Sequence, residues 1–394
     1  SDALEKTDVF IGTVQEMGVT YNAINGHHCK SIVRRSMHQF KAAEESLLKA
    51  LELNKGAGIK VLDMMCKREL ANIYSSSGKL EAAMEQVEYL IANKDKEPGC
   101  AKYQNTKLIE IKIHIMKREF EKAEQLLEDY KAEFPVSNLV NNTIYQLLLE
   151  TLLFIGQGKL TKALDSGSRL LETAVGSGKK ADIWATQALT AYCCANTGKI
   201  EEALDVSTRA YQNLAQCDFN GNTSFLIQLY HFFVLKKARK LEKAYSVLET
   251  AYSKLMLCAD QLDDKEWSSD FLGNVPEHAG LCREWTAYRG KLEAGTVLVA
   301  AAADHAPKRG QLKLVNRKKI SLTLYHPADE AEENSKTLRL KRIARLSKEA
   351  EAQDAVLSAE ILAELLKVSR ITIIRDLKEL ETNGFFIKTR GNLW

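Results

Sequence analysis

The chain has 394 residues, of which 45% are hydrophobic and 27% charged, and its formal net charge is +3. This composition indicates a globular protein with room for about two or three domains, and it excludes a disordered or collagen-like chain. The longest apolar run, from Ala294 to Ala303, is too short for a membrane span, which takes about 20 residues, so we expect no membrane partner.

The cysteines and the missing motifs indicate which kinds of site to expect. The eight cysteines form no CxxC pair and no secretory signal is visible, which favours reduced thiols and a cytoplasmic location. His27, His28 and Cys29 have no second half at zinc spacing, so we expect no metal site. Phosphate-binding glycine loops, HExxH and GxSxG motifs do not occur. We therefore expect no catalytic residues and no cofactor.

An aliphatic or aromatic residue followed three positions later by alanine recurs along the first 244 residues. Six such pairs are spaced by 40, 40, 40, 40 and 41 residues, and their first members are Phe40, Leu80, Phe120, Leu160, Ile200 and Leu241. Each of these anchors opens a segment with the apolar spacing of an amphipathic helix. Gly78, Gly158 and Gly198 stand two residues before their anchors, where a tight turn needs a positive φ. The pattern predicts six antiparallel helix pairs with turns near positions 39, 79, 119, 159, 199 and 240.

The second of these units carries the residues of a known repeat: Leu70, Ala71, Tyr74, Gly78, Leu80 and Ala83. In these positions the chain resembles tetratricopeptide repeat (TPR) proteins, although the usual period there is 34 residues. The resemblance covers roughly residues 5–260 and implies an all-α, TPR-like solenoid of stacked helical hairpins over residues 1–290. Residues 268–285 resemble the terminal segment of such arrays in bacterial regulators, and Leu281 and Trp285 are expected to cap the stack.

The first helices of stacked hairpins line a concave surface. In the TPR register, repeats two and three give this surface a polar half with Arg68, Asn72 and Lys112. The other half is nearly all apolar: Tyr145, Leu148, Leu152, Tyr192, Leu229 and Phe233. The polar half suits a peptide carboxylate and the apolar half suits an amphipathic helix. Peptide binding, internal packing of the superhelix and occupation by the protein's own downstream segment all stay open.

The composition changes after residue 290. Small residues and the run HAPKRG predict a flexible junction from Ala294 to Gly310, and the alternation at Ile320, Leu322 and Leu324 predicts a short strand. Residues 291–335 are therefore expected to be a linker. From His305 onward there are 18 Lys and Arg against 12 Asp and Glu, which suits a polyanionic partner or simply a solvated helix face.

Residues 336–394 are expected to form a small helical module. A helix is predicted over residues 336–353, and Ser358 and Ser369 are expected to cap two further helices separated by a short turn. Gly384 ends the last helix, and residues 385–389 alternate like a strand. Over about 35 residues this spacing resembles the winged helix-turn-helix of bacterial and archaeal transcription regulators, particularly the DeoR-like type.

The resemblance implies that the second helix enters the major groove of duplex DNA. Residues that would face phosphates and base edges are Ser369, Arg370, Thr372, Arg375, Lys378 and Arg390. Ile371 and Ile374 depart from this pattern, because their positions are often polar or basic in DNA-binding proteins. The sequence thus predicts a transcriptional regulator whose solenoid binds a protein or peptide. The alternative is a scaffold or adaptor in which both the TPR array and the winged helix bind proteins.

Overall fold

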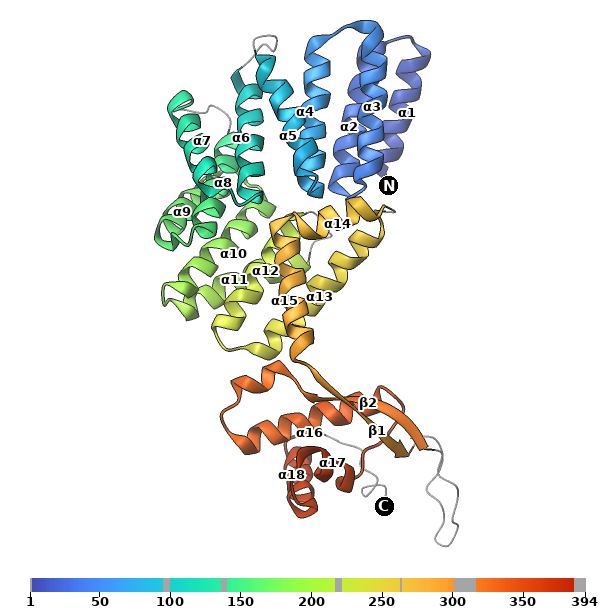
Figure 1. The fold of residues 1–394 in the computed structure, drawn as a ribbon, viewed down its shortest axis with the longest axis vertical. Coiled ribbons are helices and arrows are strands. Elements are labelled where there is room, and N and C mark those ends of the chain that lie inside the picture. The colour runs from blue at the N-terminus through green and yellow to red at the C-terminus, as the bar shows by residue number, and fades with distance from the viewer. Residues whose placement is uncertain are drawn as a thin grey trace. The chain divides into compact units, whose positions relative to one another are not determined.

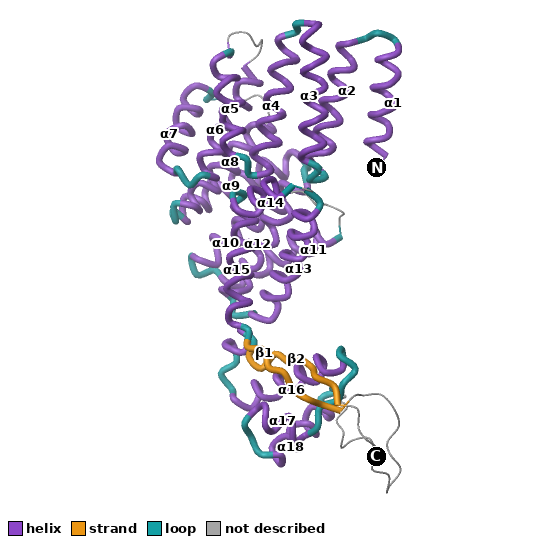
Figure 2. The backbone as a smooth tube through the Cα atoms, turned by 45° about the vertical axis from the view of Figure 1, so that its right-hand side comes forward, coloured by secondary structure: helices purple, strands orange, loops and turns teal. Residues whose placement is uncertain are grey.

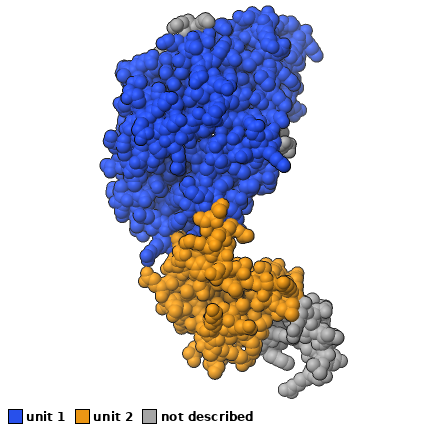
Figure 3. All heavy atoms as spheres, viewed as in Figure 1, with its two compact units in different colours: residues 1–239, 243–285 blue, residues 240–242, 286–394 orange. Residues whose placement is uncertain are grey.

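The computed structural model describes residues 2–94, 100–135, 140–216, 222–262, 264–300 and 317–385. These residues divide into two compact units (Figure 3). Unit 1 consists of residues 1–239 and 243–285, and unit 2 of residues 240–242 and 286–394. The prediction placed the end of the solenoid at residue 290.

Unit 1 is a TPR-like solenoid of helical hairpins, and the predicted fold class is confirmed (Figure 1). Helix α1 (Asp2–Glu16) precedes six hairpins formed by described residues. They are α2 (Thr20–Ser36) with α3 (Phe40–Ala57), α4 (Lys60–Ser77) with α5 (Leu80–Ala92), α6 (Cys100–Met116) with α7 (Phe120–Glu133), α8 (Val140–Gly156) with α9 (Leu160–Ser177), α10 (Lys180–Asn196) with α11 (Ile200–Ala215), and α12 (Asn222–Lys237) with α13 (Leu241–Asp260). Every second helix begins at the anchor residue that the repeat predicted.

The alanines of the repeat lie where the helices of a hairpin pack most closely. All six are at most 1% exposed: Ala43, Ala83, Ala123, Ala163, Ala203 and Ala244. The turn before each anchor uses a positive φ in every hairpin, at Gly78, Gly158 and Gly198 but also at His38, Arg118 and Arg239. The first repeat therefore keeps the register despite lacking the glycine.

Two helices follow the last hairpin, α14 (Lys265–Gly273) and α15 (Pro276–Lys291). The side chain of Asp264 caps α14 by accepting bonds from the backbone N–H groups of Glu266 and Trp267. Leu281 is fully buried, and the ring of Trp285 stacks on Tyr252 of α13 with 4.6 Å between centroids. These contacts agree with the expected capping role.

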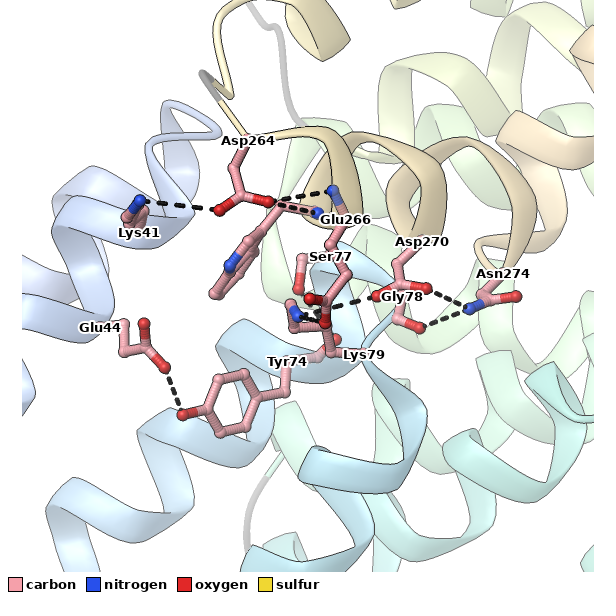
Figure 4. A network of polar contacts seen from close by, with 11 residues as sticks. Lys41, Glu44, Tyr74, Ser77, Gly78, Lys79, Asp264, Glu266, Asp270 and Asn274 are labelled. Carbon is pink, nitrogen blue, oxygen red and sulfur yellow. Dashed lines mark hydrogen bonds and ion pairs between the residues drawn. The ribbon is translucent and has the colours of Figure 1, made fainter.

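The same segment does more than cap, because it joins the two ends of the array. The Asn274 side chain donates to the backbone oxygen of Gly78 at 3.0 Å, and Lys79 pairs with Glu266 at 2.5 Å (Figure 4). Helix α12 takes part as well: the side-chain amide of Asn222 donates to the Ser76 carbonyl at 3.0 Å. The solenoid of unit 1 is thus closed by contacts between its first two and its last repeats.

An aromatic cluster lies at the same junction. Phe271 of α14 is fully buried, with its ring centroid 5.8 Å from Phe40 and 4.2 Å from His278. The Trp267 ring stacks on Phe40 at 6.4 Å. Because aromatic pairs add to the free energy of burial, this cluster stabilises the closure more than the exposed ion pairs do.

Unit 2 combines a small sheet with helices (Figure 2). Its described residues form the antiparallel strands β1 (Glu293–Ala300) and β2 (Arg317–Tyr325), the 3-10 helix η2 (Pro327–Ala331), and the helices α16 (Ser335–Glu351), α17 (Ala359–Leu366) and α18 (Arg370–Thr382). Gln353 bonds with both backbone groups of Ser321, and Glu349 accepts the N–H of Thr323 at 2.6 Å. Side chains thereby satisfy the free edge of β2.

The short strand that the sequence predicted around Ile320 to Leu324 lies within β2, whereas β1 occupies the start of the expected flexible junction. Val299 of β1 is 1% exposed and packs, with Ile320 and Leu322 of β2, against Ile343 and Leu346 of α16. The small residues at the start of β1 resembled a junction, whereas the alternation of Val297 and Val299 is that of a half-buried strand. Residues 301–310 of the predicted junction lie outside the described residues.

Candidate peptide-binding cavity and C-terminal module

Unit 1 contains a cavity of about 1840 Å³, lined by the first helices of the hairpins and by α13 to α15. This exceeds the roughly 300–1,000 Å³ of small-molecule sites, so a peptide segment fits. Eight of the nine predicted groove residues line it: Asn72, Lys112, Tyr145, Leu148, Leu152, Tyr192, Leu229 and Phe233.

Arg68 is the exception, and its predicted place in the groove is wrong. The residue is only 8% exposed, and its Nε donates to the Thr106 hydroxyl on α6 at 3.3 Å. One helical turn separates Arg68 from Asn72, but the side chain turns into the contact between α4 and α6. The bond to Thr106 is one of the interactions that stabilise the buried guanidinium in this position.

The apolar half of the cavity is built around three aromatic rings. Tyr192 of α10 lies 5.1 Å from Tyr230 and 5.8 Å from Phe233 of α12, measured between ring centroids. Leu229 contacts α15 so closely that a Cβ added to Gly280 would lie 2.7 Å from it. This wall offers edge and face contacts to apolar or aromatic side chains.

The polar half carries a lysine on α6 and a glutamate on α15. The Lys112 ammonium donates to the Ser75 hydroxyl at 3.2 Å, and burial lowers the pKa of Lys112 to about 8. Burial also raises the pKa of Glu277, which lines the same cavity. Arg35 lines it too, paired with Glu69 at 2.6 Å. Two charges of opposite sign therefore reach the cavity from elements far apart in the sequence.

Sequence reasoning missed three of these lining residues: Arg35, Tyr230 and Glu277. Tyr230 follows Leu229 directly, and on a straight helix adjacent residues point about 100° apart, so the register selected only its neighbours. Glu277 belongs to the predicted capping segment. No local pattern indicates that this segment returns to the cavity, because the return depends on the curvature of the whole array.

Helices α17 and α18 are the two short helices that the sequence predicted here, with a short turn between them. Ser358 accepts a bond from the Ile361 N–H at 3.3 Å, and Ser369 accepts one from the Thr372 N–H at 3.2 Å, which confirms both caps. Lys367 adopts the left-handed conformation that ends α17. Residues 386–394, which include Arg390 and most of the predicted wing, lie outside the described residues.

The predicted DNA-contacting residues of α18 differ in their surroundings. Ser369, Arg370, Arg375 and Lys378 are exposed, whereas Thr372 is half-buried with its hydroxyl 2.9 Å from that of Ser369. The Arg370 guanidinium pairs with Glu360 of α17. Arg375 and Lys378 are thus the clearest cations of this helix for an outside partner.

The described residues of unit 2 carry nearly balanced charge, and α18 exposes an apolar side chain. Residues 317–385 hold 13 Lys and Arg against 12 Asp and Glu, so most of the basic excess belongs to residues 305–316 and 386–394, outside the described part. Ile371 is 70% exposed, while Ile373 and Leu377 are buried in the core as their spacing requires. An apolar side chain consequently stands among the exposed cations of α18.

Comparison with known proteins gives one family. A family model described as "Protein of unknown function (DUF1670)" matches residues 281–394. No curated protein matches the chain. The matched segment starts within α15 and contains residues 286–394, which are all of unit 2 except residues 240–242.

Several solved structures resemble the chain at low sequence identity. A "Rap Protein Complexed with Competence and Sporulation Factor" aligns with a TM-score of 0.49 and 12% identity, over 68% of this chain and 76% of that one. A tetratricopeptide repeat protein from Parabacteroides merdae gives a TM-score of 0.39 and 13% identity, over 70% and 99% of the chains. A kinesin light chain repeat structure from Podosopora anserina gives 0.37 and 16%, over 48% and 92%.

The described residues were also searched for other kinds of site. Within them, no helix has the length and hydropathy needed to cross a bilayer. In the same part of the chain, His, Cys, Asp and Glu side chains do not gather in threes at a spacing that could hold a metal ion.

Proposed function

We propose that this protein is a regulator whose solenoid binds a peptide segment of a partner protein in the cavity of unit 1. The observation that carries the proposal is the two-part lining: an aromatic and aliphatic wall beside a half that presents charged groups. Binding sites combine a mainly apolar surface with a few polar groups that orient the ligand. TPR-like solenoids present such concave surfaces because small rotations between successive repeats add up along the array.

The test removes the apolar wall without disturbing the hairpins. Leu152→Asp combined with Phe233→Asp should abolish retention of a degenerate peptide library by the immobilised full chain, while helical circular dichroism stays unchanged. The matched control is Leu48→Asp with Val175→Asp, two exposed positions outside the cavity. If both double variants retain the library equally, binding lies elsewhere.

We further propose that unit 2 binds duplex DNA through α18, so that the protein acts as a transcriptional regulator. The proposal is supported by the resemblance to DeoR-like winged helices and by the exposed Arg375 and Lys378. Under this proposal the full chain binds DNA with an affinity that falls steeply as salt rises. Arg375→Ala should weaken binding by about 1–3 kcal/mol if the side chain reaches base edges, and less if it contacts only phosphate. Ile371→Ser should have little effect.

A second candidate function for unit 2 is docking onto a protein, as in a scaffold or adaptor. It is favoured by the exposure of Ile371 and by the near balance of charge over residues 317–385. Apolar side chains at the centre of an interface carry much of its affinity. Undetectable DNA binding at low salt, together with loss of a protein partner on Ile371→Ser, would establish docking instead.

A further inference from the structure

Lys112 and Glu277 form an unusual pair in the cavity of unit 1. Burial is the largest effect on both groups, and it lowers the pKa of Lys112 and raises the pKa of Glu277. The charge of each residue acts on the pKa of the other in the opposite direction, but more weakly. Within the described residues, however, neither has an ion-pair partner within 4.0 Å. Among the described residues, the Lys112 ammonium donates a hydrogen bond to the hydroxyl of Ser75 alone. Both charged groups therefore line one cavity, and within the described residues no ion pair joins them.

We infer that the cavity selects a peptide segment with adjacent acidic and basic groups, the carboxylate bound by Lys112 and the ammonium bound by Glu277. This inference rests on the proposed peptide-binding function and names the chemistry of the ligand. A buried charge is stabilised when an opposite charge also supplies hydrogen bonds, and these bonds are stronger than neutral ones. A ligand with both groups compensates the charges of Lys112 and Glu277 at once, whereas a singly charged ligand leaves one of the two uncompensated.

Two other residues that line the cavity, Arg35 and Tyr230, favour one orientation of the ligand. Arg35 adds positive charge near Lys112, since it acts on the pKa of Lys112 in the lowering direction, and this favours an anion on that side. Tyr230 lines the same cavity as Glu277, whose charge adds to burial in raising the pKa of that tyrosine. An aromatic face beside a carboxylate is a favourable place for an ammonium group, because the ring quadrupole attracts cations.

The apolar wall then accounts for the rest of the segment. Tyr230 belongs to the cluster with Tyr192 and Phe233, so the ring on which the charge of Glu277 acts is part of the apolar wall. A ligand anchored by its charged pair would therefore place its next side chains against these aromatic rings. The selectivity comes from the charges and the remaining affinity from apolar contact.

The experiment uses the immobilised full chain and heptapeptide pools without Arg or His, with N-acetylated and C-amidated ends so that side chains carry the only charges. One pool holds adjacent Asp and Lys, and the others hold Asp only, Lys only or neither. The Asp-Lys pool should be retained on the order of tenfold better than each other pool, as expected for one charge-assisted bond. Because only the ligand changes, this comparison does not depend on how any variant folds.

Variants then assign each group. Lys112→Met should remove the preference for Asp and keep that for Lys, and Glu277→Gln should do the reverse. Lys122→Met and Glu121→Gln, exposed on α7, serve as matched controls and should change neither preference. Equal retention of all pools overturns this inference and leaves peptide binding standing. Equal retention of the Asp-only and Asp-Lys pools also overturns it. If no pool is retained, the proposed function fails with it.

Discussion

The side-chain amide of Asn274 donates a hydrogen bond to the backbone oxygen of Gly78, 196 positions earlier in the chain. Gly78 has a φ of +84°, and a Cβ built on it would lie 2.2 Å from the backbone oxygen of Asp270. The same glycine thus makes the turn of the second hairpin and lets α14 approach the backbone. Gly158 holds the equivalent turn with open space around it.

Gly78→Ala should therefore destabilise unit 1 more than Gly158→Ala does. Both alanines adopt a left-handed conformation that costs about 1–2 kcal/mol, but only the first collides with a backbone atom. We expect an extra loss of about 1–3 kcal/mol in the free energy of unfolding, as in overpacked sites. Urea denaturation of the full chain measures both values, and equal losses would contradict the close approach of α14.

His278 should make unit 1 sensitive to acid. The ring is fully buried, its Nδ1 donates to the Phe271 carbonyl at 2.8 Å, and burial lowers its pKa from 6.5 to about 3. Between these values the unfolded chain binds a proton that the folded chain excludes, so stability falls as the pH drops from about 6.5 toward 3. The slope of the free energy of unfolding against pH reports the number of protons that the chain takes up on unfolding. His278→Asn should lower that number by up to one, measured in denaturation series from pH 7 to 4. His38 and His231 keep part of it, since burial lowers their pKa values too.

The repeat alanines should tolerate no enlargement. Ala123 and Ala203 are at most 1% exposed, so Ala123→Leu and Ala203→Leu should each cost about 1–3 kcal/mol through overpacking. Ala132 is exposed on the same helix as Ala123, and Ala132→Leu is the matched control. Thermal unfolding of the three variants checks the prediction. A melting temperature of Ala123→Leu that matches Ala132→Leu would rule out close packing at this position.

Asp329 should be central to the stability of unit 2. It is 8% exposed, and its carboxylate accepts bonds from Arg345 at 2.7 Å and Arg342 at 2.8 Å. Burial raises its pKa, but the bonds from these two arginines outweigh burial and hold the pKa below its usual value. Asp329→Asn should cost about 1–3 kcal/mol, because two partly buried cations lose their counter-charge. Hydrogen exchange of α16 reports the loss, and Asp354→Asn, an exposed change, should leave exchange unaltered.

The elements that the sequence predicts well are those determined by neighbouring residues. Phe120 and Ala123 define a hairpin because helix pairing in each repeat is local, and Ser369 caps α18 through a bond to a backbone group three residues away. The sequence did not predict strand β1, because small residues such as Ala294 and Gly295 at its start are typical of a flexible junction. The pairing that makes it a strand comes from β2, beyond residue 316.

The candidate cavity shows the same division. The TPR register found Lys112, Leu152 and Phe233, since positions on the inner helices repeat with the hairpins. Glu277 could not be found, because small rotations between repeats accumulate over the array before α15 reaches the cavity wall. Arg68 fits the register as well as Asn72 does, but packing between α4 and α6 takes its side chain away from the cavity.

The bond between Gly78 and Asn274 also sets an order of events during synthesis. Hairpins can fold as they leave the ribosome, since each needs only its neighbours. Asn274, which donates the hydrogen bond to Gly78, is translated 196 positions later, roughly 10–40 s at 5–20 residues per second. During this interval Phe40 lacks the aromatic rings of α14 as packing partners. The candidate cavity is therefore complete only when α14 and α15, which line part of it, have been synthesised.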